Sequence, residues 1–260
     1  MTYVRAAAAA FYISMRLRFV SGFAIMGFLV FPLILAAVGL FVLNKPGTTA
    51  TQWTYGLLGG GLIGYWGITY LDAGNGIQIE RWNGTLEHIF AVPTPLWVIV
   101  LGKALGGLVW GMLSFIPTIA LAYFGFHALL PQLDAGRFAI SFAVLTFSFL
   151  AIALSLSPLF AMWRWAFTMI NGFELGTYVL CGFMFPITIL PGWLQAVSAL
   201  LPPTWGTRAL YAATTAEGPH DFVAWWAATV VLSVAYIGLS VFLFRLVDRR
   251  ARATGELALA

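Results

Sequence analysis

The chain has 260 residues, of which 61% are hydrophobic and 8% charged, and its mean hydropathy is +0.92. Soluble domains carry about 25% charged residues, so this composition excludes an ordinary soluble protein and indicates an all-α integral membrane protein. The net charge of +4 is spread along the chain and forms no patch, which argues against a nucleic-acid partner.

The N-terminal residues 3–19 carry Phe11, Met15 and Phe19 at a spacing of four, together with three arginines. This spacing places the three apolar side chains near one helical face. We therefore expect a helix that lies along the membrane interface, and the alternative is a plain anchor for the first span.

Six segments contain about the 20 apolar residues that a membrane span requires. They are residues 20–43, 54–78, 96–124, 138–160, 166–187 and 222–245. Of the 13 lysines and arginines, all but Lys45, Arg137 and Arg208 lie on the side of the N-terminus. The positive-inside rule therefore predicts that both termini are cytoplasmic. Arginine is strongly preferred over lysine and alanine is abundant, which suggests a bacterial source and hence a bacterial inner membrane.

Glycines recur at a spacing of four in two of the expected spans. Gly56, Gly60 and Gly64 line one face of the second span, and Gly102 and Gly106 line a face of the third. Faces without side chains allow membrane helices to approach closely, so we expect tight helix packing at both.

Two carboxylates, Asp72 and Glu174, fall within expected spans. Placing a charged carboxylate at membrane depth is unfavourable in free energy, so each of these side chains should face a partner helix, a water-filled cavity or a cation such as Arg164. Both residues are candidates for the wall of a substrate path or for a polar contact that transmits movement. The alternative is a structural hydrogen bond within the bundle, which we favour for Asp72.

Residues 80–95 form a polar segment between two apolar ones. Leu86, Ile89 and Phe90 fall at i, i+3 and i+4, which places them on one helical face, and Glu87 lies in the first turn, where the helix dipole favours it. We expect a short amphipathic helix over residues 84–92 at the cytoplasmic membrane face. An ordinary interfacial loop helix without any partner is the alternative.

A second distinctive segment precedes the last span. Pro186, Pro191 and the prolines at 202–203 divide it into pieces too short to cross a membrane. The piece that contains Trp193 carries an apolar helical stripe. We expect a re-entrant segment over residues 187–205 that dips into the outer leaflet.

The two segments together resemble the ABC-2 family of exporter permeases, in order and on opposite membrane faces. The motifs that carry the resemblance are Glu80-Arg81, Gly84-Thr85-Leu86-Glu87, Pro93-Thr94-Pro95, Gly102-Lys103, and the run from Gly182 through Pro186 and Leu190-Pro191 to Trp193-Leu194-Gln195. The resemblance covers the whole chain, 1–260, as one transmembrane domain. Within this family, the chain is similar in particular to the daunorubicin-resistance-type permeases.

The resemblance implies a fold with six transmembrane helices, an N-terminal interfacial helix, a cytoplasmic coupling helix and external re-entrant helices before the last span. It also implies two ATP-binding cassette subunits and a second permease copy, either identical or related, within membrane lipid. The residues implied to contact the ATPase are Arg81, Gly84, Thr85, Leu86, Glu87, His88, Ile89 and Phe90.

Two further groups of candidate site residues follow. The candidates for an intramembrane polar path are Glu174 and Asp72. The candidates for an outer gate and the re-entrant turn are Phe183, Met184, Phe185, Pro186, Pro191 and Trp193.

Motifs for chemistry on this chain are missing from the sequence. Gly102-Lys103 has Trp97 at the place of the first Walker A glycine and Ala104 after the lysine, so ATP and Mg are expected on the partner ATPase and Lys103 is expected to snorkel. The single cysteine and three dispersed histidines give no metal spacing and no internal disulfide. We therefore expect a transporter subunit rather than an enzyme.

The expected path is apolar and aromatic, which suits export of a hydrophobic drug, a lipid or a glycolipid. The alternatives are a permease for a polysaccharide or glycoconjugate, and a membrane scaffold or sensor that binds an ATPase without transporting anything.

Overall fold

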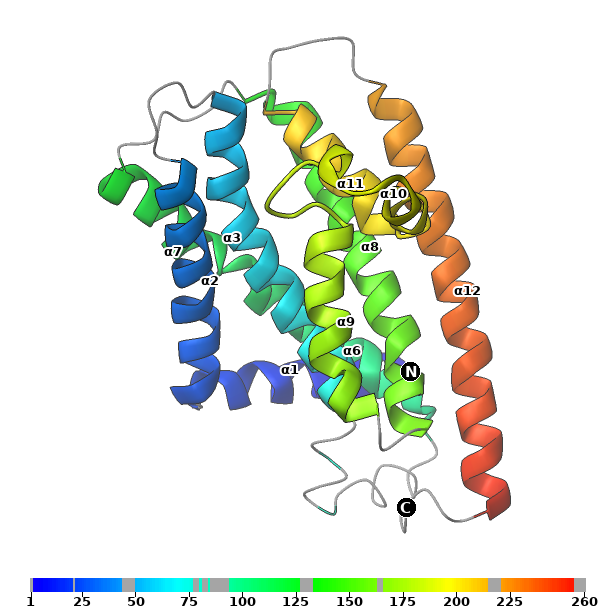
Figure 1. The fold of residues 1–260 in the computed structure, drawn as a ribbon. Coiled ribbons are helices and arrows are strands. Elements are labelled where there is room, and N and C mark those ends of the chain that lie inside the picture. The colour runs from blue at the N-terminus through cyan, green and yellow to red at the C-terminus, as the bar shows by residue number, and fades with distance from the viewer. Residues whose placement is uncertain are drawn as a thin grey trace.

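The structure is a computed structural model that describes residues 2–20, 22–43, 50–76, 80, 84, 94–126, 133–162, 166–214 and 221–254. Every regular element within these ranges is helical, which confirms the all-α prediction. The helices form one elongated bundle (Figure 1).

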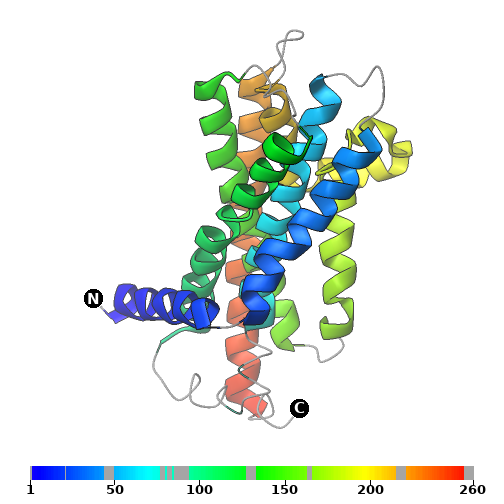
Figure 2. The same ribbon diagram turned by 90° about the vertical axis from the view of Figure 1, so that its left-hand side faces the viewer.

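The first helix, α1 (Thr2–Val20), lies across one end of the bundle, at a steep angle to the helices that run lengthwise (Figures 1 and 2). The last helix, α12 (Phe222–Thr254), ends at the same end of the bundle (Figure 1). Both ends of the described chain thus lie at the same end of the bundle, as expected for an even number of crossings (Figures 1 and 2).

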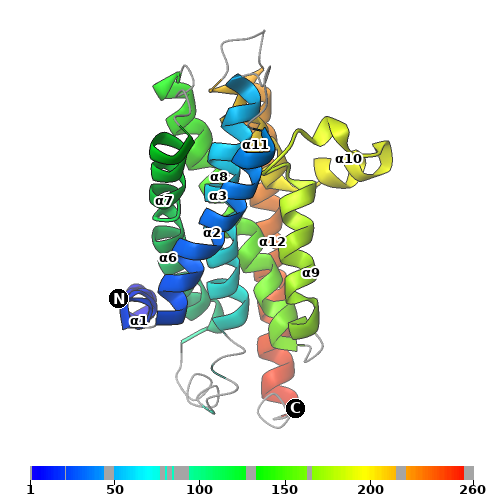
Figure 3. The same ribbon diagram turned by 60° about the vertical axis from the view of Figure 1, so that its left-hand side comes forward.

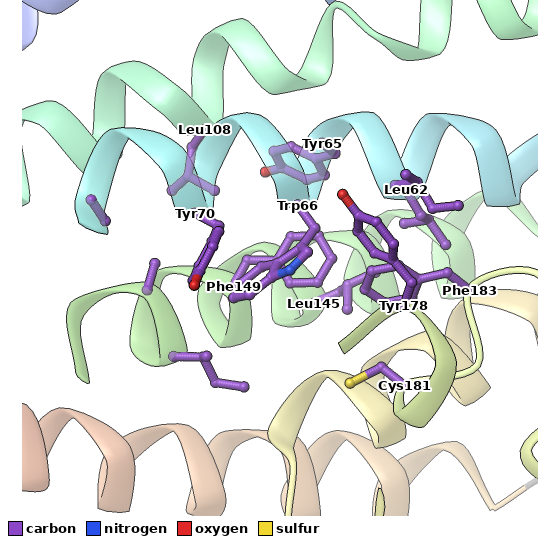
Figure 4. Packing of buried hydrophobic residues seen from close by; sticks show 14 of the residues in the cluster. Leu62, Tyr65, Trp66, Tyr70, Leu108, Leu145, Phe149, Tyr178, Cys181 and Phe183 are labelled. Carbon is purple, nitrogen blue, oxygen red and sulfur yellow. The ribbon is translucent and has the colours of Figure 1, made fainter. Parts of the chain in front are cut away.

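The centre of the bundle is α3 (Ala50–Tyr70), which is buried on all sides from residue 56 to residue 70. A helix that is apolar all round belongs in the interior, and α3 presents only glycine, aromatic, aliphatic and threonine side chains there. Figure 4 shows Tyr65 and Trp66 of α3 packed near Phe149 of α8 (Ala135–Met162). The ring centroids of Tyr65 and Trp66 lie 5.2 and 5.3 Å from that of Phe149.

The glycines of α3 allow α2 (Gly22–Leu43) to approach closely. A Cβ added at Gly60 would overlap Ala36 of α2, and one added at Gly64 would overlap Pro32. The close approach predicted from the glycine spacing is therefore confirmed.

The next helical run bends once. It consists of α6 (Leu96–Met112), α7 (Phe115–Ala120) and the π-helical turn η2 (Leu121–Gly125). The break falls at residues 113–114 because Pro117, four residues after Leu113, has no N–H to donate to the Leu113 carbonyl.

Four of the described helical segments are long and apolar enough to cross a membrane: Ile25–Val42, Leu96–Gly125, Ala135–Phe160 and Phe222–Arg249. The other two expected spans correspond to α3, which is rich in glycine, and to α9 (Ala166–Leu180), which has 15 residues. The protein is thus an all-α membrane protein, and its number of crossings stays a prediction.

Helix α9 ends at Leu180, seven residues before the predicted end of the fifth span. Gly182 adopts a left-handed conformation with φ of +68°. Its N–H donates to the Val179 carbonyl at 3.3 Å, and the N–H of Phe183 donates to the Tyr178 carbonyl at 3.1 Å. These two bonds form a Schellman motif, which stops the helix although the following residues are apolar.

The proline-rich segment forms three short helices at the end of the bundle opposite α1: η3 (Ile187–Ile189), α10 (Gly192–Ala199) and α11 (Pro202–Ala212). Helix α10 projects sideways from the bundle (Figure 3). The division into short pieces follows the prolines, as predicted.

Candidate functional site: a polar junction at the end of the bundle

The end of α3 nearest α1 widens into a π-helical turn, η1 (Leu71–Asn75). A π turn inserts an extra residue and often occurs at functional sites, because it changes the direction of one side chain without ending the helix. Here it carries Asp72, one of the two intramembrane carboxylates singled out from the sequence.

Asp72 is held by two side chains of α1. The Arg18 guanidinium donates Nε–H to Oδ2 at 3.1 Å and pairs through Nη2 with Oδ1, and the Ser14 hydroxyl lies 3.3 Å from Oδ2. The Arg18 and Asp72 side chains are 14% and 15% exposed. A two-pronged arginine–carboxylate pair fixes orientation as well as distance, so α1 is held firmly to the end of α3.

The same face of α1 lies directly on α6. A Cβ added at Gly102 would overlap the carbonyl of Ala7, and one added at Gly106 would meet Ser14. The two glycines of α6 therefore provide the space in which α1 sits.

A second ion pair lies beside the first. Lys103 of α6 donates to the Glu80 carboxylate at 2.7 Å and to the Gly76 carbonyl at 3.2 Å. Lys103 thus holds Glu80, which follows η1 in the chain, and does not extend toward the solvent as a snorkelling side chain would. We call Ser14, Arg18, Asp72, Glu80 and Lys103 the polar junction.

Most of the predicted ATPase-contacting residues lie outside the described part of the chain, namely Arg81, Thr85, Leu86, Glu87, His88, Ile89 and Phe90. Gly84 is described: it is exposed in a turn with φ of +67°. The coupling helix over residues 84–92 therefore stays a prediction.

Glu174, the second predicted carboxylate, has different partners from Asp72. The Tyr178 hydroxyl donates to its Oε1, and the carboxylate packs against the bare backbone of Gly67. The structure therefore places the two carboxylates in separate surroundings.

The predicted outer-gate residues divide into two groups. Phe183 is fully buried, and its carbonyl accepts a hydrogen bond from the Tyr211 hydroxyl. Met184 and Phe185 are half-buried, while Pro186, Pro191 and Trp193 are exposed. Phe183 thus anchors the turn to the core, and the gate stays a prediction.

Sequence reasoning did not find Ser14 and Arg18 as partners of Asp72. The sequence carries a signal for close packing of this face, though none for Asp72 as its partner: Ser14 and Arg18 share a helical face with the small residues Ala7 and Ala10.

Comparison with known proteins agrees with this architecture. Residues 55–214 match the family model described as ABC-2 type transporter. The chain is also 30% identical over 124 residues to proteins named "Probable multidrug ABC transporter permease YbhR" from Escherichia coli strains K12 and O157:H7. That match covers 47% of this chain and 33% of each relative, so it spans about a third of their length. Because the family model covers more than half of the 260 residues, the chain belongs to the ABC-2 type transporter family and is an ABC-2 type permease.

Proposed function

We propose that this permease is the membrane subunit of an ATP-driven exporter and moves a hydrophobic drug, a lipid or a glycolipid outward across the bacterial inner membrane. Two separate ATP-binding cassette subunits supply the energy, with ATP and Mg bound on them. A second permease copy, identical or related, completes the path. Each subunit has six spans and cytoplasmic termini.

The observation that carries this proposal is the polar junction. It fixes α1 to the end of α3 through Arg18 and Asp72, and it fixes Glu80, which precedes the 81–93 segment, to α6 through Lys103. A force that reaches Glu80 therefore acts on α6 through Lys103, and it acts on the central helix α3 through the chain that joins Glu80 to η1.

Coupling in this scheme needs no chemistry on the chain itself. Closure of the ATPases upon ATP binding pushes the amphipathic helix at 84–92, whose apolar face holds Leu86, Ile89 and Phe90. The push passes through the polar junction to α3 and α6, and substrate leaves between the paired permeases.

The relatives named as probable multidrug permeases favour a drug or lipid substrate. The low charge of the bundle points the same way, because a long charged polysaccharide would need a polar path. Polysaccharide or glycoconjugate export is the second candidate, and a scaffold or sensor that binds an ATPase without transport is the third.

The experiment that tests the proposal is co-purification with the candidate ATPase, followed by an assay of ATP hydrolysis. We compare the wild type with Phe90→Asp, and Phe90→Leu serves as the matched control that keeps an apolar side chain. Burying a neutral polar group without a hydrogen bond costs about 2–7 kcal/mol and an unpaired carboxylate costs more, so Phe90→Asp should lose the complex while Phe90→Leu keeps it.

Wild-type protein that binds no ATPase would remove the energy source and overturn the exporter proposal. Wild-type complex formation without substrate efflux from vesicles would favour the scaffold or sensor.

A further inference from the structure

An arginine at the end of the bundle opposite α1 has no carboxylate partner among the described residues. Arg208 of α11 is exposed, and it forms neither a hydrogen bond nor an ion pair with any residue of the described ranges. At the same end, Arg137 of α8 pairs with the Asp134 carboxylate at 3.3 Å. Asp221 caps α12 instead of pairing with Arg208, because its Oδ1 accepts the Ala224 N–H at 3.1 Å. The positive charge of Arg208 is therefore not neutralised by the described chain.

Two tryptophan rings hold this guanidinium in place. The Cζ of Arg208 lies 5.9 Å from the ring centroid of Trp205 on its own helix and 5.4 Å from that of Trp225 on α12. The Trp205 indole is itself fixed, because its Nε1–H donates to the Ala199 carbonyl at the end of α10 at 2.9 Å. A guanidinium that rests on ring faces keeps the N–H groups in its own plane available. Arg208 can therefore donate them to an anion.

The guanidinium lies at the height where lipid headgroups are expected. Helices α10, α11 and the start of α12 meet at this end of the bundle (Figure 1). They carry four tryptophans, Trp193, Trp205, Trp225 and Trp226. Tryptophan is enriched at membrane–water interfaces, so this group marks an interface, which the predicted topology makes the outer one.

Apolar surface continues from this site along α12. Trp225, Leu232 and Leu239 recur every seven residues, which places them near one face of the helix. Leu232 is half-buried and Leu239 is 47% exposed, so acyl chains can reach this face. A ligand with an anionic head and long apolar chains matches both the guanidinium and the surface beyond it.

We propose that Arg208, with Trp205 and Trp225, binds the phosphate of an anionic phospholipid headgroup in the outer leaflet. The guanidinium donates to two phosphate oxygens, because its planar fork matches their spacing. An anionic headgroup such as phosphatidylglycerol is favoured over a zwitterionic one, because it brings no second cation beside Arg208. The bound lipid joins α11 to α12 next to the re-entrant segment. This site goes beyond the proposed function, since it requires neither an ATPase nor transport.

The test measures which lipid lies beside Arg208. A fluorophore is attached to Ala224→Cys, an exposed position one residue before Trp225, while the native Cys181 is buried and should stay unlabelled. The full-length permease is placed in phosphatidylcholine nanodiscs. Phosphatidylglycerol or phosphatidylcholine with the same brominated acyl chains is then added at equal mole fraction. Bromine quenches a nearby fluorophore, so quenching reports how often each lipid occupies this place.

In the labelled protein with Arg208 intact, we expect phosphatidylglycerol to occupy the site about fivefold more often than phosphatidylcholine. Arg208→Gln keeps N–H donors but removes the charge, so it should abolish this preference. Arg137→Gln is the matched control, because Arg137 also lies over an aromatic ring, that of Phe222, but is already paired with Asp134. The control should keep the preference.

Two further comparisons keep the proposal testable if Arg208→Gln folds poorly. Arg208→Lys retains the charge but lacks the planar fork, so its preference should be intermediate. Inorganic phosphate, compared with chloride at the same ionic strength, shows whether the site holds a lipid or a free anion. We expect the two salts to have the same effect, because free phosphate lacks the acyl chains that pack along α12.

Equal quenching by the two lipids when Arg208 is intact would overturn the site, as would an unchanged preference in a folded Arg208→Gln variant. Equal loss of preference in Arg137→Gln and Arg208→Gln would also overturn it, because the effect would then come from the overall charge of the outer face. Displacement of phosphatidylglycerol by inorganic phosphate but not by chloride would assign Arg208 to a free anion and overturn the lipid site.

Discussion

Arg18 of α1 and Asp72 of η1 form a two-pronged ion pair across 54 positions of sequence. The pair joins the helix that crosses the end of the bundle to the helix at its centre. Because Asp72 lies in a π turn, a change from π to α geometry would turn its side chain and break the contact with Arg18. The ion pair is thus sensitive to the conformation of the end of α3.

Separating this ion pair should destabilise the protein more than exchanging its charges. Arg18→Ala leaves a largely buried carboxylate with Ser14 as its remaining α1 partner, so we expect a loss of about 3 kcal/mol in the free energy of unfolding. The exchange Arg18→Asp with Asp72→Arg should recover part of that loss. Thermal unfolding of the detergent-solubilised single and double variants measures both, and strict additivity of the two single substitutions would contradict the prediction.

The Lys103–Glu80 pair should contribute less to stability and more to coupling. Its side chains are 18% and 25% exposed, so Lys103→Ala should cost only about 1 kcal/mol. If the 81–93 segment transmits the push of the ATPases, this variant should still bind ATPase and hydrolyse ATP while substrate efflux falls. Efflux equal to that of the wild type would remove Lys103 from the coupling route.

A larger side chain at Gly102 should lift α1 from α6. The position faces the Ala7 carbonyl and the Ala10 side chain, so Gly102→Val produces a clash with backbone atoms that a rotamer change cannot relieve. A cysteine placed at Ala7 should become reactive toward a water-soluble maleimide in this variant and stay poorly reactive otherwise. The native Cys181 is buried and should contribute little background.

Gly172→Val is the control for this experiment, since a Cβ at Gly172 meets no atom within 4 Å. Equal labelling of Ala7→Cys in the Gly102 and Gly172 variants would contradict the packing prediction.

The turn after α9 depends on one glycine. Gly182→Ala forces an L-residue to φ of +68° and brings its Cβ against Ile187 and the Phe185 carbonyl, so we expect a loss of about 2 kcal/mol in unfolding free energy. Gly192→Ala at the first residue of α10 is the matched control, because a Cβ there meets nothing within 4 Å. Thermal unfolding that ranks the two variants in the opposite order would show that the Schellman motif does not hold this turn.

The features that depend on local sequence pattern could be predicted from the sequence. The contacts between residues far apart in the chain could not. The divided helices after residue 186 follow from prolines, and the close helix contacts follow from glycine spacing. The predicted end of the fifth span, residue 187, was wrong. Hydropathy assigns Phe183, Met184 and Phe185 to the membrane span, whereas the left-handed conformation of Gly182 ends the helix before them.

The candidate site shows the same limit. Asp72 could be singled out as a costly carboxylate, and a polar contact was expected for it. Its partner could not be named, because no local periodicity connects positions 18 and 72. The identity of the partner follows only once α1 is seen to lie across the end of the bundle, over α6 and η1 (Figure 1).

The glycines of α3 have a consequence for how the molecule can change shape. Gly60 and Gly64 admit α2, Gly61 admits Phe115 of α7, and Gly67 admits Glu174 of α9, so the helix has close neighbours on several sides at defined heights. A helix packed in this way can neither rotate about its axis nor translate along it without steric overlap. Helix α3 can tilt only together with the helices packed against it. The motion open to this bundle is therefore a rigid-body rotation of the packed helices.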